Sequence, residues 1–139
     1  MARTLEIFTM GDIHWDERVG DYMSKNLITI DEDATMYDAV QMMLDNKIHG
    51  LLVTDDDKLK GIITSYDVLI IMEKGKSSKN TSVKEAMSSD IVYVTPEDKI
   101  ITAVNKMLEN DIRRLPVIDN GRLVGIITTT DIVTAFRDK

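Results

Sequence analysis

Gly125-Ile126-Ile127-Thr128-Thr129-Thr130-Asp131 decides the fold, because a near copy, Gly61-Ile62-Ile63-Thr64-Ser65-Tyr66-Asp67, stands 64 residues earlier in the chain. The same offset, with no gap, brings further identical residues into register: Val19 with Val83, Met23-Ser24 with Met87-Ser88, Ala39-Val40 with Ala103-Val104, and Met43-Leu44 with Met107-Leu108. Self-similarity at one fixed offset over such a span indicates a duplicated structural unit.

The repeat divides the chain into four parts. We expect an N-terminal extension over residues 1–18, a first motif over 19–75, a linker over 76–82 and a second motif over 83–139. The linker consists of small and polar residues, which is typical of a surface connection. Neither motif alone is long enough to bury much of its surface, so we expect the two to pack against each other about a pseudo-twofold axis.

Composition narrows the function classes. Hydrophobic residues make up 43% of the 139 residues, and the formal net charge is −7. A negative surface disfavours nucleic acid and anionic membranes as partners. The chain has no cysteine, which excludes disulfides and a cysteine nucleophile. Its longest apolar run, residues 68–72, is too short to span a bilayer. We therefore expect a cytoplasmic protein without a membrane segment.

The second motif shows the clearer element pattern. Ile91–Val94 is rich in β-forming residues, and Thr95-Pro96 is typical of a helix start. A helical apolar stripe follows and ends near Asn110. Two apolar runs around Asn120-Gly121 predict a hairpin, since the tight turn needs positive φ. Pro116 implies a position without a ladder donor. Thr130–Phe136 predicts a closing helix.

The first motif repeats this order. Leu27–Ile30 predicts a strand, and Leu51–Val53 and Gly61–Ile63 predict the hairpin strands. A last helix is expected from Ser65. The apolar helical stripe, which we expect in the core, consists of Met36, Ala39, Val40, Met43 and Leu44. Each motif is thus strand–helix–strand–strand–helix, and the fold class is α+β.

The ordered set of motifs resembles the CBS domain family. The resemblance rests on the Met-Ser lead-in, the amphipathic helix, the Arg113-to-Asp119 segment and the Gly-Ile-Ile-Thr-x-x-Asp ending, and it covers nearly the whole chain from Val19 onward, twice. It implies a tandem CBS pair that forms homodimers. It also implies a non-catalytic regulatory module that binds an adenine nucleotide (AMP, ADP or ATP, with S-adenosylmethionine as a further candidate), needs no cofactor and acts on another protein.

The resemblance assigns a ligand site to the second motif. Asp131 would accept hydrogen bonds from the ribose hydroxyls, and Thr128 and Thr130 would donate to ribose or phosphate, helped by the helix N-terminus. Arg113 and Arg114 would reach the phosphate through charge-assisted contacts, although either could be a surface residue paired with acids. The adenine would lie against Asp90, Ile91 and Leu115. The alternatives are an ordinary helix cap for Asp131 and core packing for Leu115.

The first motif supplies a second, less well equipped site. Its members are Asn26, Leu27, His49, Gly50, Thr64, Tyr66 and Asp67. Tyr66 replaces the small donor Thr130, so its ring either stacks on a ligand or simply packs. His49 either contacts phosphate or is an ordinary solvated or core histidine. We therefore expect the two sites to be unequal.

Other functions are weighed against nucleotide sensing. The main alternative is a protein-interaction or dimerisation scaffold with vestigial clefts. An enzyme is disfavoured, because the sequence shows no nucleophile–base pair and no phosphate-binding glycine loop. Asp12, His14, Asp16 and Glu17 lie close together, but their spacing matches no metal motif, so we expect no metal site. The apolar residues Leu5, Ile7, Phe8 and Trp15 are expected to pack on the pair or on a dimer partner.

Overall fold

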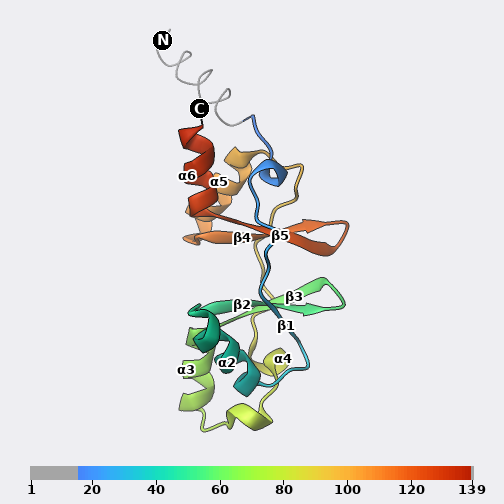
Figure 1. Ribbon diagram of the computed structural model, residues 1–139. Helices are drawn as coiled ribbons and strands as arrows, with labels where there is room; N and C mark the ends of the chain where they lie inside the picture. Colours follow the sequence, from blue (N-terminus) through green and yellow to red (C-terminus); the bar gives the residue numbers. More distant parts are fainter. Residues whose placement is uncertain (1–15, 139) are drawn as a thin grey trace. The chain divides into compact units, whose positions relative to one another are not determined.

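The computed structural model describes residues 16–138, which form two compact units (Figure 1). Unit 2 is Ile28–Ile91, whereas unit 1 combines the N-terminal part of the chain up to Leu27 with the chain from Val92 onward. The units therefore differ from the two sequence motifs. The first residues of the first motif belong to unit 1, with most of the second motif, and the first residues of the second motif belong to unit 2, with most of the first motif.

Unit 2 is built on a three-stranded sheet. The central strand β2 (Gly50–Asp55) pairs in parallel with β1 (Thr29–Asp31) and antiparallel with β3 (Lys58–Thr64). The helical elements of this unit are α2 (Met36–Asn46), α3 (Ser65–Glu73), η2 (Ser78–Asn80) and α4 (Val83–Ala86). The strands Leu51–Val53 and Gly61–Ile63 and the helix from Ser65, all predicted from sequence, are confirmed.

Local chemistry sets the ends of α2. The Thr35 side chain accepts from the Asp38 N–H, and the Asp38 carboxylate accepts from the Thr35 N–H, which satisfies two N-terminal donors. Lys47 ends the helix in the left-handed conformation with φ of 54°. Met36, Ala39 and Met43 then pack in the core of the unit, beside Leu51, Val53 and Ile63.

Unit 1 contains the hairpin of β4 (Arg114–Asp119) and β5 (Arg122–Thr128). Asn120 and Gly121 both have positive φ, 52° and 80°, which confirms the predicted tight turn. Pro116 pairs with Ile126, whose N–H and C=O bond to Ser24 instead, so no ladder donor is lost. The helical elements are η1 (Val19–Asp21), α5 (Ile100–Asn110) and α6 (Thr129–Arg137).

The start of α5 corrects the sequence prediction. Thr95-Pro96 does not begin the helix, which starts at Ile100 after a turn. The carbonyls of Pro96 and Asp98 accept from the N–H groups of Gly20 and Val19, so the lead-in residues occupy the groups that a helix would use. This competing pairing is with a segment almost eighty residues away, and a local pattern does not reveal it.

The predicted strand Ile91–Val94 is also corrected. Only Val94 pairs, in an isolated parallel bridge with Val117, and no strand forms there. In the first motif the equivalent strand is β1, which begins at Thr29 rather than at Leu27. The order strand–helix–strand–strand–helix is therefore complete in unit 2, and the α+β class holds for the chain.

The lead-in residues of each motif pack into the other motif's core. Val19 is fully buried among Val94, Ile100 and Leu115 in unit 1, and Val83 is fully buried in the core of unit 2. Ser24 exchanges two backbone hydrogen bonds with Ile126 of β5. Ser88 does the same with Ile62 of β3, at 2.9 Å each way. The two motifs are thus interlocked through exchanged segments.

Two expectations about burial change. The linker is not wholly at the surface, because Thr81 is buried and its carbonyl accepts from the Met36 N–H. Leu44 was expected in the core but is 67% exposed, and its counterpart Leu108 is 76% exposed. Both leucines stand on the outer side of their helices, while Met43 and Met107 next to them are buried.

Candidate ligand-binding site

The Thr-x-x-Asp segment has the same geometry in both units. In unit 1 the Asp131 carboxylate accepts from the Thr128 N–H at 2.8 Å and from the Thr128 hydroxyl at 3.1 Å. In unit 2 Asp67 accepts from Thr64 at 2.8 Å and 3.2 Å. Oδ2 accepts both bonds in each case, so Oδ1 keeps its capacity to accept from a ligand hydroxyl. The helix-cap interpretation is confirmed, and it is compatible with ligand binding.

The residue before β4 and the residue before β2 each lie next to the start of a helix, α6 and α3 respectively. The Arg113 carbonyl accepts from the Thr129 N–H at 3.0 Å, and the His49 carbonyl accepts from the Ser65 N–H at 2.8 Å. One basic or titratable residue is therefore fixed beside the first turn of α6 and of α3. The side chains of Arg113 and His49 are exposed, as those of ligand-contacting residues must be.

The arrangement can bind a ribose phosphate in chemical terms. A carboxylate accepts from vicinal hydroxyls, and hydroxyl groups and backbone N–H groups at a helix N-terminus favour an anion. In unit 1 Thr130 adds an exposed hydroxyl in the first turn of α6. Arg113 adds a guanidinium, which suits phosphate better than any other side chain.

The other predicted members of the second-motif site differ in exposure and in the unit to which they belong. Arg114 is exposed at the start of β4 and pairs with Thr128 across the hairpin. Leu115 is fully buried in the core, so only its backbone can face a ligand. Asp90 and Ile91 belong to unit 2, and their contact with the remaining members, all in unit 1, stays a prediction.

The first-motif site is divided in the same way. Asn26 and Leu27 belong to unit 1, and the other predicted members belong to unit 2. Gly50 begins β2 and pairs with Thr64, which places it beside the helix cap. Tyr66 is 69% exposed in the first turn of α3, so its ring does not pack in the core. This finding excludes simple core packing for Tyr66 and leaves a surface role.

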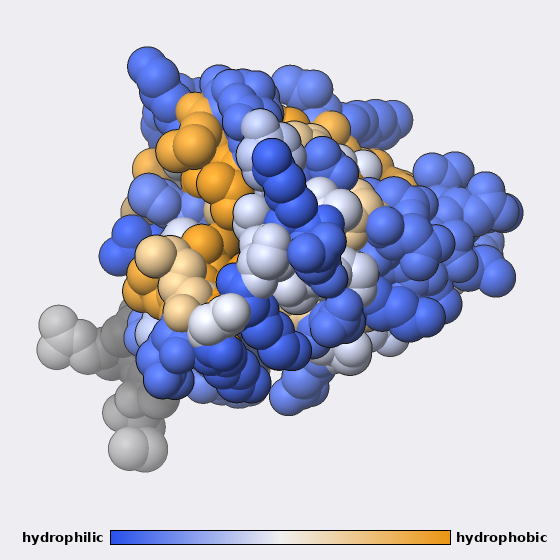
Figure 2. All heavy atoms as spheres, turned by 90° about the horizontal axis from the view of Figure 1, so that it is seen from below, coloured by the Kyte–Doolittle hydropathy of each residue, from blue (hydrophilic) through white to orange (hydrophobic). Residues whose placement is uncertain are grey.

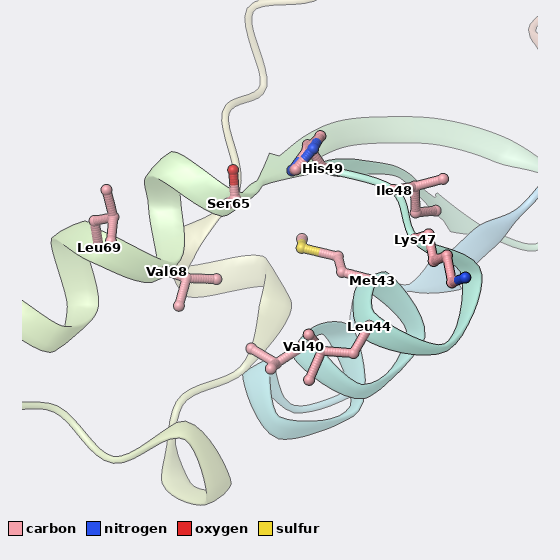
Figure 3. Close-up of a pocket in the computed structure, with 9 residues that line it drawn as sticks. All are labelled: Val40, Met43, Leu44, Lys47, Ile48, His49, Ser65, Val68 and Leu69. Atoms are coloured by element: carbon pink, nitrogen blue, oxygen red, sulfur yellow. The ribbon is translucent and has the colours of Figure 1, made fainter.

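Unit 2 also contains a hollow of about 460 Å³ between α2 and α3. Figure 3 shows side chains from both helices around it, with His49 and Ser65 close together at the strand end. The lining is mainly apolar and consists of Val40, Met43, Leu44, Lys47, Ile48, His49, Ser65, Val68 and Leu69. His49 thus stands at the border between the helix cap and an apolar hollow.

The predicted absence of a metal site can be compared with the described part of the chain. Among residues 16–138 no group of three or more histidines or acidic residues could hold a metal ion. No helix within the same range is long and apolar enough to cross a membrane.

The N-terminal extension is described only from Asp16 onward. Asp16 forms an exposed ion pair with Lys99 at 3.9 Å. Asp12 and His14 lie outside the described residues, as do Leu5, Ile7, Phe8 and Trp15.

The comparison with family models agrees with the repeat and the fold. The model of the CBS domain matches twice, over residues 19–74 and 83–138. The chain belongs to the CBS domain family. The Met-Ser lead-ins and the Gly-Ile-Ile-Thr endings of both motifs lie inside the matched ranges, and the tandem arrangement is that of a CBS pair.

Known proteins are similar to this chain over most of its length. An uncharacterized protein of Methanocaldococcus jannaschii, MJ1225, is 34% identical over 85% of the chain. The structure of CBSX2 in complex with AMP has a TM-score of 0.76 and 29% identity, and covers 88% of this chain and 97% of that one. The CBS pair of MJ0100 in complex with 5′-methylthioadenosine and S-adenosyl-L-methionine has a TM-score of 0.71 and 28% identity, and covers 87% and 96%.

The chain is shorter than its curated relatives. It spans 42% of the length of MJ1225 and less than half of most of the other curated relatives that it matches. The names and activities of those longer proteins therefore describe more than a CBS pair.

Sequence reasoning missed the apolar surface of the CBS helices. Leu69 and Met72 of α3 are 59% and 67% exposed, and Val133 and Phe136 of α6 are 66% and 60% exposed. A signal was present, since all four residues lie on the sequence repeat at offset 64 and at helical spacing. The sequence analysis assigned the stripe of the first helix of the motif to the core and assigned these four residues to no face, because apolar periodicity does not distinguish a buried face from an exposed one.

Proposed function

We propose that this CBS pair is a regulatory, non-catalytic module that binds an adenine nucleotide, with AMP as the first candidate. The observation that carries the proposal is the geometry at Thr128 and Asp131, in a chain whose structural neighbours CBSX2 and MJ0100 hold AMP and an adenosine derivative. Binding would signal to another protein only if the nucleotide prefers one conformation or association state of the module.

The second-motif site is the stronger of the two in this proposal. It combines Asp131 with Thr130 and Arg113, whereas the first-motif site offers Tyr66 and His49 at the equivalent positions. A short hydroxyl donates to a phosphate without occupying its space, and a guanidinium carries a permanent charge. We therefore expect AMP to fill the second-motif site first.

The test is calorimetric titration of nucleotide-stripped protein with AMP, ADP, ATP and S-adenosylmethionine. Asp131→Ala should weaken binding at least tenfold. Asp98→Ala is the matched control, because the Asp98 carboxylate accepts from the Thr95 N–H at the same 2.8 Å but stands outside the proposed site. Equal losses in both variants would indicate a structural effect only. No binding of any of the four ligands by the wild type would refute the proposal.

An interaction scaffold is the second candidate. The exposed apolar side chains of α2, α3, α5 and α6 favour it, because a monomer rarely leaves so many large apolar residues in water without a partner. The titration separates the two candidates, since a scaffold with vestigial clefts associates normally and binds none of the four ligands.

A further inference from the structure

Met23 and Met87 are equivalent methionines in the lead-in segments of the two motifs, 64 residues apart. Met23 packs on Gly125 of β5, and Met87 packs on Gly61 of β3, so each methionine contacts the hairpin of the other motif. A Cβ on Gly125 would lie 3.2 Å from the Met23 Cγ, and one on Gly61 would lie 3.0 Å from the Met87 Cγ, with the sulfur nearer still in both cases. Each thioether therefore lies directly against the backbone of a strand.

These two methionines differ from the core methionines in their contact with water. Both are only partly buried, where they pack against the cores of units 1 and 2. The methionines of the cores themselves are at most 6% exposed, namely Met36, Met43 and Met107. The chain has no cysteine, so its methionines hold all of its sulfur. A water-borne oxidant therefore reaches Met23 and Met87 more readily than the core methionines.

Hydrogen peroxide converts a methionine thioether to a sulfoxide without a further reactant. A lone pair of the sulfur attacks one peroxide oxygen, the O–O bond breaks, and the second oxygen leaves as water with both protons. The sulfur is oxidised by two electrons and the peroxide is reduced by the same two. The product side chain is polar and larger than methionine, and it no longer suits an apolar contact.

A sulfoxide at Met23 would form beside a carbonyl that already has a partner. The Ser24 carbonyl oxygen lies next to the same point above Gly125 as the Met23 sulfur, and it accepts from the Ile126 N–H at 2.9 Å. The sulfoxide oxygen is a second acceptor, so it crowds this carbonyl and repels it. Met87 stands in the same relation to the Ser88 carbonyl.

We propose that Met23 and Met87 are sites of reversible oxidation, at which a peroxide releases the lead-in segments from the hairpins of the opposite motifs. The lead-ins also carry Val19 and Val83, each fully buried in a core formed mainly by the other motif, so their release loosens both cores. Because the two methionines are equivalent in the repeat, one oxidant acts on both connections between the motifs.

The consequence for ligand binding rests on the proposed function. Asn26 follows Met23 by three residues, and Asp90 follows Met87 by three residues. Both are predicted members of the nucleotide sites, so displaced lead-ins should weaken AMP binding. Release of the lead-ins itself requires no nucleotide, and it is therefore measured without one.

Amide exchange in the oxidised protein tests the proposal. The full chain is treated with hydrogen peroxide, peptide mass spectrometry locates each sulfoxide, and nuclear magnetic resonance follows individual amides. Sulfoxides should form at Met23 and Met87 before they form at the core methionines. The amides that bond the lead-ins to the hairpins should then exchange about tenfold faster or more, namely those of Ser24, Ile62, Ser88 and Ile126. Repair by methionine sulfoxide reductases of both stereospecificities should restore slow exchange.

Two double variants separate these sulfurs from the others. Met23→Leu combined with Met87→Leu keeps apolar side chains of similar volume, an exchange that packed cores tolerate, and should keep slow exchange after the same treatment. Met42→Leu combined with Met72→Leu is the control, and should respond to peroxide as the wild type does. Figure 2 shows apolar side chains at the surface of the molecule, and Met72 is 67% exposed, so peroxide has direct access to a methionine that the control removes.

Sulfoxides at Met23 and Met87 without faster exchange of the lead-in amides would overturn the proposal, as would resistance of both sulfurs to peroxide in the folded protein. Equal acceleration in the variant with both leucines would assign the effect to another methionine, and would overturn it as well. If that variant does not fold, oxidised and enzymatically repaired wild type give the same decision. AMP titration of the untreated protein is a separate measurement, so a failure of nucleotide binding leaves the exchange result unaffected.

Discussion

Met23 packs against Gly125, although the two residues belong to different CBS motifs. A Cβ on Gly125 would lie 2.7 Å from the Met23 sulfur and 2.9 Å from the Ser24 carbonyl oxygen. Met87 and Ser88 stand over Gly61 in the same way, at 2.6 Å and 2.7 Å. The glycine of each Gly-Ile-Ile-Thr ending thus makes room for the lead-in segment of the other motif.

Gly125→Ala should destabilise the chain. The added methyl group meets the backbone oxygen of Ser24, a residue that exchanges two hydrogen bonds with Ile126, so we expect the free energy of unfolding to fall by about 1 to 3 kcal/mol. Gly61→Ala should have the same effect. Chemical denaturation monitored by circular dichroism measures both.

Gly50→Ala is the control for these variants. Its Cβ would stand 3.4 Å from the Ile63 carbonyl oxygen and 3.6 Å from the Thr64 methyl group, which are ordinary contacts. It should change the free energy of unfolding by less than either of the other two. Equal destabilisation by all three would mean that strand propensity, rather than the crossing lead-in, explains the loss.

Val19→Ala should loosen the distant motif rather than its own. The Val19 side chain is fully buried in the core of unit 1, so its truncation should cost about 2 kcal/mol there. Amide hydrogen exchange should accelerate in α5, β4 and β5 more than in α2, β2 and β3. Val83→Ala is the matched variant, with the opposite pattern. Acceleration within the same sequence motif would contradict the exchanged arrangement.

Patterns of neighbouring residues predicted most helices and strands correctly, but they did not predict the hydrogen bonds between segments far apart in the sequence. The hairpin at Asn120-Gly121 follows from residues in contact along the chain, and it was placed correctly. The start of α5 was predicted wrongly. The carbonyls of Pro96 and Asp98 accept from the N–H groups of Gly20 and Val19, so they are not available for hydrogen bonds within a helix. Sequence spacing carries no information on a hydrogen bond between segments so far apart.

The candidate site shows the same limit. The Thr128–Asp131 contacts were foreseeable, since three residues separate the partners and the chemistry is that of a helix cap. The exposure of Leu44 and Leu108 could not be predicted, because helical periodicity identifies an apolar face but does not show whether that face is buried.

Exchange of Tyr66 and Thr130 should reverse the ranking of the two sites. Thr130→Tyr places a bulky ring where a hydroxyl is proposed to donate, and should weaken AMP binding about tenfold, roughly 1.4 kcal/mol. Tyr66→Thr should strengthen binding at the first motif and raise the measured stoichiometry. Both side chains are exposed, so thermal unfolding serves as the control and should change little. An unchanged affinity in both variants would remove these positions from the site.

Arg113→Ala should weaken AMP binding and leave adenosine binding almost unchanged. The Arg113 carbonyl accepts from the N–H of Thr129, the first residue of α6, so the backbone of Arg113 lies beside the helix start at which the phosphate is proposed to bind. A charge-assisted hydrogen bond contributes about 1.5 to 3 kcal/mol, so the affinity for AMP should fall about 10- to 150-fold. Arg114→Ala is the neighbouring control, and it identifies which arginine acts on phosphate. Equal losses for AMP and adenosine would show that Arg113 supports the local fold instead, because adenosine has no phosphate for it to contact.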